Sequence, residues 1–140
     1  MQLQPLRLRP GDDLRQRLEQ AVSEAAGGGA FVVSGMGSLS VAMLRYAGRQ
    51  DATTLRGDLE LLSLAGSICR DGAHLHAVVA DAQGHVLGGH LCPGSRVRTT
   101  AEILLAILPS DTPLQRALDP ATGFQELVIE APGHHQSHGS

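Results

Sequence analysis

The chain has 140 residues, 42% of them hydrophobic, which suits one domain with a core of ordinary size. Its formal net charge is −3, and all 11 of its basic side chains are arginines. A protein that binds nucleic acid by neutralising phosphates normally has a basic face, so this charge balance disfavours autonomous DNA binding. With one Tyr, two Phe and no Trp, the chain also lacks the aromatic side chains on which single-stranded bases stack.

The beginning of the chain, MQLQPLRLRP, lacks the apolar segment of a secretory signal. No apolar run approaches the length of a membrane span. The two cysteines, Cys69 and Cys92, do not form a metal-ligand spacing by themselves. We therefore expect a cytoplasmic protein with reduced thiols and no membrane contact.

The first third of the chain predicts a strand followed by a helix. Residues 2–10 alternate loosely between apolar and polar side chains, which indicates a short strand. Leu14, Leu18 and Val22 then recur at helical spacing, after two aspartates that can cap a helix. Three glycines at 27–29 end this predicted helix.

The next segment, VVSGMGSLS, looks like a phosphate-binding loop but does not complete the motif. A dinucleotide fingerprint needs a third glycine where the chain has Ser40, and a helix should begin there to hold the phosphates. The following residues carry no helical stripe. We interpret 35–37 as a glycine-rich turn between strands at 30–34 and 38–47.

The remaining elements complete a mixed fold. Residues 51–70 are expected to form a loop and then a long strand. A second helix is expected in 96–108, with Thr99 or Thr100 as its cap and Glu102 in its first turn. Pro109 ends this helix, and ATGFQELVIEA at 121–131 predicts a last strand. The whole pattern indicates an α+β domain over residues 1–131, with a mostly antiparallel sheet and two main helices. We expect the His-, Gly- and Ser-rich tail at 132–140 to be disordered.

Four of the seven histidines lie in HLHAVVADAQGHVLGGH, residues 74–90, which predicts a β-hairpin. Asp81-Ala82-Gln83-Gly84 has the composition of a turn, and pairing Asp81 with His85 sets the register. That register places His76 opposite His90. His74 is two residues from His76 and projects from the same face, whereas His85 lies near the turn.

Three imidazoles on one patch of sheet favour a divalent metal, with zinc as the first expectation. Three protein ligands would leave an open coordination position. The alternative interpretation is a polar hairpin face whose histidines are unrelated. Cys92, two residues after His90, is either a further soft ligand or a small buried residue.

Several stretches of the chain resemble the PPC domain family, the plant and prokaryote conserved domain. They run from Phe31 to Ile129 and read FVVSGMGSLSVAMLRY, GDLELLSLAGSI, GAHLHAVVADAQGHVLGGHL, TTAEI and TGFQELVI. The resemblance implies a mostly antiparallel α/β fold, a homotrimer, and a standalone metal-binding form of the domain with zinc held by His74, His76 and His90. It also brings an association with DNA, which in plants accompanies AT-hooks that this chain lacks.

The sequence is compatible with three functions. The first is a trimeric metal-binding module with a regulatory or interaction role. The second is a metal-dependent enzyme of hydrolase or lyase type, with Glu102 as a weak candidate for the catalytic base. The third is association with DNA, which rests on analogy to the plant relatives alone.

Overall fold

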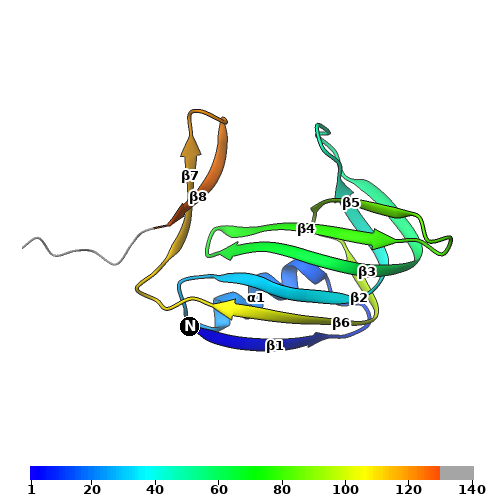
Figure 1. Cartoon of the computed structure of the whole chain (residues 1–140), viewed down its shortest axis with the longest axis horizontal. Helices are drawn as coiled ribbons and strands as arrows, with labels where there is room; N and C mark the ends of the chain where they lie inside the picture. Colours follow the sequence, from blue (N-terminus) through cyan, green and yellow to red (C-terminus); the bar gives the residue numbers. More distant parts are fainter. Residues whose placement is uncertain (130–140) are drawn as a thin grey trace, which may run out of the picture.

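A curved six-stranded sheet, one helix and a projecting two-stranded hairpin make up the computed structural model, which describes residues 1–129 (Figure 1). Every strand pairing in this part of the chain is antiparallel. In chain order the elements are β1 (Gln2–Leu8), α1 (Leu14–Glu24), β2 (Ala30–Arg45), β3 (Thr53–Cys69), β4 (Gly72–Ala80), β5 (Val86–Leu91), β6 (Arg96–Ile107), β7 (Leu114–Asp119) and β8 (Phe124–Ile129).

The large sheet has the strand order β1-β6-β2-β3-β4-β5 and curls until its last strand meets the end of β2. In this second pairing Leu44 lies opposite Leu91 and Arg45 lies opposite His90. The curl brings residues far apart in the sequence to the same end of the sheet. Separately, β7 and β8 pair only with each other among the described strands and project away from the sheet (Figure 1).

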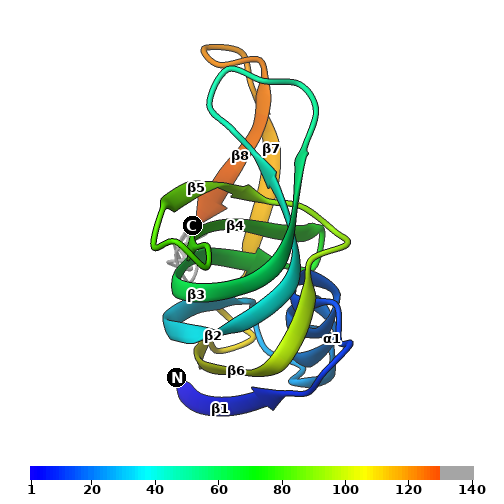
Figure 2. The same cartoon turned by 90° about the vertical axis from the view of Figure 1, so that its right-hand side faces the viewer.

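The predicted first helix is confirmed as α1, and it covers one face of the sheet (Figure 2). The Asp13 carboxylate accepts a hydrogen bond from the Gln16 amide at 3.0 Å and so caps the first turn. The same carboxylate accepts from the Gly94 amide at 2.8 Å, which ties the helix to the segment between β5 and β6. Leu14 and Leu18 are fully buried against the sheet. No helix within residues 1–129 is long and apolar enough to cross a membrane.

The predicted second helix at 96–108 is wrong, because this segment forms β6 between β1 and β2. Its core-facing side chains alternate along the strand, with Ala101, Ile103 and Leu105 buried. The apolar run around them is hydrophobic on both faces, so its periodicity does not separate helix from strand. Hydrogen bonding to a strand on each edge decides the conformation, and Thr99, Thr100 and Glu102 therefore stand in a strand and not at a helix N-terminus.

The predicted turn at 35–37 is also wrong, because β2 runs from Ala30 to Arg45 without a break. Three register shifts against β6 absorb the irregularity as bulges, and they lie between Val32 and Ser34, between Gly37 and Leu39, and between Leu39 and Val41. A Cβ atom on Gly37 would overlap the Thr100 carbonyl oxygen. The glycines thus allow close strand contact where a phosphate loop would have needed a helix.

Gly66 lies where β3 closely approaches β4, the strand that carries His74 and His76. A Cβ atom at Gly66 would overlap the carbonyl oxygen of His74, whereas Gly57 on the same strand has nothing within 4 Å. Both glycines have positive φ, 143° and 126°. We expect Gly66→Ala to lower the free energy of unfolding by about 1–3 kcal/mol more than Gly57→Ala, through overpacking. Urea denaturation of both variants measures the difference, and equal losses would mean that only backbone strain matters.

Candidate functional site

The β4–β5 hairpin has the register that the sequence predicted. His76 lies opposite His90, Val78 opposite Gly88, and Val79 opposite Leu87. At the turn, the Asp81 amide donates to the His85 carbonyl oxygen at 3.0 Å. The Asp81 carboxylate accepts from the amides of Gln83 and His85 at 3.0 and 2.9 Å, which locks the loop. These hydrogen bonds hold the pairing that sets where the histidines lie.

His74, His76 and His90 form one cluster, in which a nitrogen atom from each ring lies within 4.8 Å of the others. The ring centroids are 5.0 Å apart for His74 and His76, 5.3 Å for His74 and His90, and 6.0 Å for His76 and His90. His74 and His76 are exposed, and His90 is half-buried. Ala73 and Leu75, which alternate with them, point into the core and fix the face from which the rings project.

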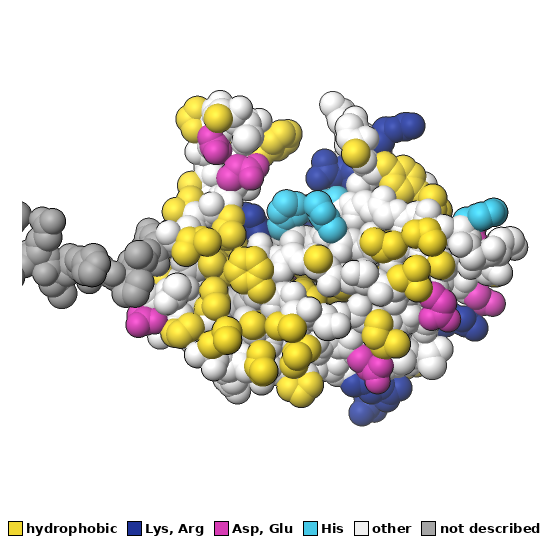
Figure 3. Space-filling view, viewed as in Figure 1, with side chains coloured by type: hydrophobic (Ala, Val, Ile, Leu, Met, Phe, Trp, Pro, Cys, Tyr) yellow, Lys and Arg dark blue, Asp and Glu magenta, His cyan; other side chains and the backbone are white. Residues whose placement is uncertain are grey.

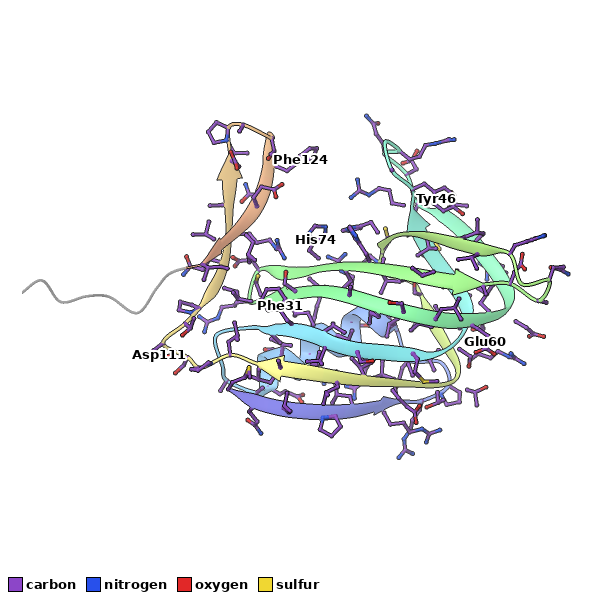
Figure 4. All side chains as sticks on the ribbon, in the orientation of Figure 1. Phe31, Tyr46, Glu60, His74, Asp111 and Phe124 are labelled. Atoms are coloured by element: carbon purple, nitrogen blue, oxygen red, sulfur yellow. The ribbon has the colours of Figure 1, made fainter. Side chains whose placement is uncertain are left out.

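The cluster lies at the floor of a hollow between two projections (Figure 3). One projection is the β7–β8 hairpin, which carries Phe124, and the other is the end of the β2–β3 hairpin, which carries Tyr46 (Figure 4). His74 lies between them on β4 (Figure 4). The walls of the site therefore come from segments distant in sequence from its floor.

Desolvation and nearby positive charge lower the pKa of two of the imidazoles. Burial is the main cause that lowers the pKa of His90 to about 4, and Arg45 is the next. Partial desolvation of the exposed His74 ring also lowers its pKa, with His76 and Arg116 adding to the shift and Glu126 opposing it. Neutral imidazole is the form that binds a metal.

Arg15 contacts the cluster from the side of the helix. Its Nη1 lies 3.5 Å from Nε2 of His90 and donates to the Leu91 carbonyl oxygen at 3.1 Å. Its Nε forms an ion pair with Glu19 at 2.8 Å. Arg15 thus helps to position His90, and its own positive charge is balanced by Glu19.

Sequence reasoning missed the arginines Arg15, Arg45 and Arg116. Arg45 stands opposite His90 only through the pairing of β2 with β5, and Arg116 lies near the cluster only because β7 comes close to β3. Neither position has a local sequence signal. Arg15 lies on the predicted helix, but nothing in the sequence places that turn of the helix beside β5.

The other residues considered from sequence are not part of the cluster. Glu102 is exposed on β6, and β2 and β3 separate that strand from β4 in the sheet. The Cys92 thiol contacts the His90 carbonyl oxygen at 3.7 Å and is not among the clustered ligand atoms. His85 is exposed at the turn, with Nδ1 3.4 Å from the Asp81 carboxylate. The tail histidines lie outside the described residues.

The three-histidine set fits a tetrahedral metal such as zinc. Zinc–nitrogen bonds of 2.0–2.1 Å require neighbouring ligand nitrogens about 3.3 Å apart. The nitrogens here lie within 4.8 Å of one another, and two of the three histidines are exposed, so a small rotation of their rings would bring the nitrogens to that distance. Three neutral nitrogen donors would leave the fourth coordination position to a water molecule or a ligand.

The lowered pKa of His90 predicts a pH dependence of stability in the presence of a chelator. The unfolded chain takes up a proton near the ordinary pKa of 6.5, whereas the folded chain resists it down to about 4. The unfolded state thus binds more protons in this range, and stability falls as the pH drops from about 6.5 to about 4. We expect a smaller fall for His90→Gln in chemical denaturation at several pH values. Parallel curves for the two proteins would contradict the prediction.

Several solved structures share this fold over most of their length. A hypothetical protein from Salmonella enterica superposes with a TM-score of 0.89 at 37% identity, covering 93% of this chain and 94% of that one. A metal-containing protein from Archaeoglobus fulgidus gives 0.77 at 27% identity, covering 91% and 94%. A protein from Ralstonia eutropha, described only as a candidate DNA-binding protein, gives 0.78 at 30% identity, covering 90% of each chain.

Among curated proteins, the chain is similar to the bifunctional protein GlmU of two Synechococcus strains. It is 49% and 48% identical to them over 130 residues, which is 93% of this chain. The chain spans only about a fifth of the length of these relatives, 21% and 20%.

A family model matches residues 1–109, and it describes the Plants and Prokaryotes Conserved (PCC) domain. The chain therefore belongs to the Plants and Prokaryotes Conserved domain family, as its sequence motifs had indicated.

Proposed function

We propose that this protein binds one divalent transition metal, with zinc as the first candidate, through His74, His76 and His90. The observation that carries this proposal is the convergence of three ring nitrogens within 4.8 Å on one face of the hairpin. The protein would act as a trimeric regulatory or interaction module in which the metal is a structural or ligand-binding centre.

Two further observations support a metal at this cluster. The pKa values of His74 and His90 are both lowered, so protons compete weakly for their nitrogens at neutral pH. The Archaeoglobus fulgidus relative, 27% identical, is described as a metal-containing protein. The geometry of the cluster and the description of this relative both favour a bound metal.

A metal-dependent hydrolase or lyase is the second candidate, because a three-histidine metal with an open position can activate water. Among the described residues, no carboxylate belongs to the histidine cluster. Glu126 is the acid whose charge acts on His74, and Glu102 lies on another strand. A panel of ester, phosphoester and amide substrates that turned over only with the metal-loaded protein would favour an enzyme over a binding module.

Association with DNA is the third candidate, and the name of the Ralstonia eutropha relative favours it. The charge of the chain opposes it, because a protein with net charge −3 and no lysine lacks a basic stripe for phosphates. A mobility shift on duplex DNA that weakens steeply with salt would support this function.

We further propose a homotrimer that buries an apolar region on the open face of the large sheet. Hydrophobic side chains gather there over β1, β6, β2 and β3 (Figure 3). Phe31, Val33, Met36 and Leu62 are 39%, 56%, 49% and 51% exposed. Exposed apolar groups of this kind mark protein interfaces.

Elemental analysis of the purified protein tests whether the histidine cluster holds a metal. We expect about one zinc per chain by elemental analysis of protein in which His134, His135 and His138 are replaced by Ser, so that the tail adds no background. His76→Ala should remove the metal, because two imidazoles no longer hold it. His85→Ala is the matched control, since this histidine lies in the same hairpin but outside the cluster, and it should keep the metal. Equal metal content in both variants would contradict the assignment.

The mass of the protein in solution tests the homotrimer. Light scattering should give a mass of three times the 14.7 kDa chain. Met36→Glu should lower this mass toward the monomer, because it places a charge in the apolar face. Leu118→Glu is the control and should leave the mass unchanged, because Leu118 is 61% exposed on the projecting β7 strand and not on the apolar face. A monomer in the unsubstituted protein would refute the trimer.

A further inference from the structure

We propose that the histidine cluster, once it holds its metal, binds a small anionic ligand that carries a carboxylate or phosphate group. An oxygen of this ligand would take the open coordination position, and Arg45 and Arg116 would hold its charge. This inference rests on the proposed metal site and names the chemical class of the ligand that the site recognises.

Arg45 places one positive charge beside the cluster. It stands directly opposite His90 in the pairing of β2 with β5, so the two Cα atoms are about 5 Å apart and the side chains leave the same face. Arg45 is half-buried. Within residues 1–129 it forms no ion pair, since the paired arginines there are Arg15, Arg17 and Arg98.

Arg116 places a second positive charge on the other side. Its Nη2 donates to the Ser67 hydroxyl at 3.0 Å, and Ser67 stands directly opposite His74 in the pairing of β3 with β4. This hydrogen bond leaves most of the five N–H donors of the guanidinium for another acceptor. Like Arg45, Arg116 is half-buried and has no ion-pair partner in the described part of the chain.

Arg15 differs from these two arginines, because Glu19 neutralises it and the Leu91 carbonyl oxygen takes another of its donors. It positions His90 but brings little free charge. Of the three arginines whose charge acts on His74 or His90, Arg45 and Arg116 are therefore the two without an ion-pair partner, one near His90 and one near His74. Basic side chains are visible on both sides of the histidine patch (Figure 3).

The charge balance of the hollow selects an anion. Three neutral imidazoles leave the two positive charges of the metal uncompensated, and Arg45 and Arg116 add two more. Glu126 is the acid that acts on the cluster from the described residues, where it opposes the effect of Arg116 on His74. A carboxylate or phosphate matches this field and the planar fork of arginine, whereas an amine would be repelled.

The shape of the site favours a small molecule over a polyanion. The cluster lies on the floor of the hollow between the two projections that carry Tyr46 and Phe124 (Figure 4). A nucleic acid would need positive charge along an extended surface, which this chain lacks. A ligand that fits between the projections needs only the local charge of the two arginines.

Cobalt-loaded full-length protein tests the inference, because the visible absorption of Co²⁺ reports directly on its coordination. The tail histidines are again replaced by Ser. The probes are sodium acetate and sodium phosphate, titrated separately at constant ionic strength with perchlorate. We expect a saturable spectral change with at least one probe, and the better probe tells a carboxylate from a phosphate preference.

Arg45→Gln and Arg116→Gln should each weaken the apparent affinity of that probe about 10-fold or more, the effect of losing one charge-assisted hydrogen bond. Both variants should still bind one cobalt per chain. Arg56→Gln is the matched control and should change the affinity less than twofold, because Arg56 is an exposed arginine of β3 that pairs with Val41, away from the histidines. Arg116→Lys, which keeps the charge, should recover part of the affinity.

The possible failures are distinguishable. Protein that takes up no cobalt would overturn both the metal site and this inference. Protein that takes up cobalt but shows no spectral response to either anion would overturn this inference alone. The same holds if the arginine variants and Arg56→Gln bind the probe equally well.

Discussion

The antiparallel pairing of β4 with β5 is the constraint on which the candidate site depends. It places His76 opposite His90 and leaves His74 on the same face. A slip of one residue would turn His90 to the opposite face of the sheet and break up the cluster. Four hydrogen bonds at Asp81 and the burial of Leu75, Ala77 and Val79 on the inner face of β4 oppose such a slip.

The curl of the sheet gives this hairpin its chemical surroundings. Because β5 also pairs with the end of β2, Arg45 stands beside His90. Because β7 contacts β3, Arg116 reaches Ser67, next to His74. The hairpin with three histidines thereby gains two arginines beside it, Arg45 near His90 and Arg116 near His74. Local pairing supplies the ligands, and long-range pairing supplies the charges that would select what binds to them.

This division between local and long-range pairing explains how much the sequence could predict. The helix at 14–24 and the histidine register depend on neighbouring residues, such as the Asp13 cap and the Asp81 turn, and both were predicted correctly. The second helix was wrong because Ile103, Leu104 and Leu105 are apolar on both faces of their strand, and strand partners distant in sequence decide their conformation. The site arginines were missed because the pairing of Arg45 with His90 has no local signal.

The most direct test of the metal site is a crystal structure of the protein purified without added metal, with anomalous diffraction measured on both sides of the zinc absorption edge. The account predicts one anomalous peak per chain, within about 2.1 Å of a nitrogen of each of His74, His76 and His90. The absence of a peak there, both in these crystals and in crystals grown with one equivalent of added zinc, would contradict it. The three histidines would then be a polar face of an ordinary hairpin.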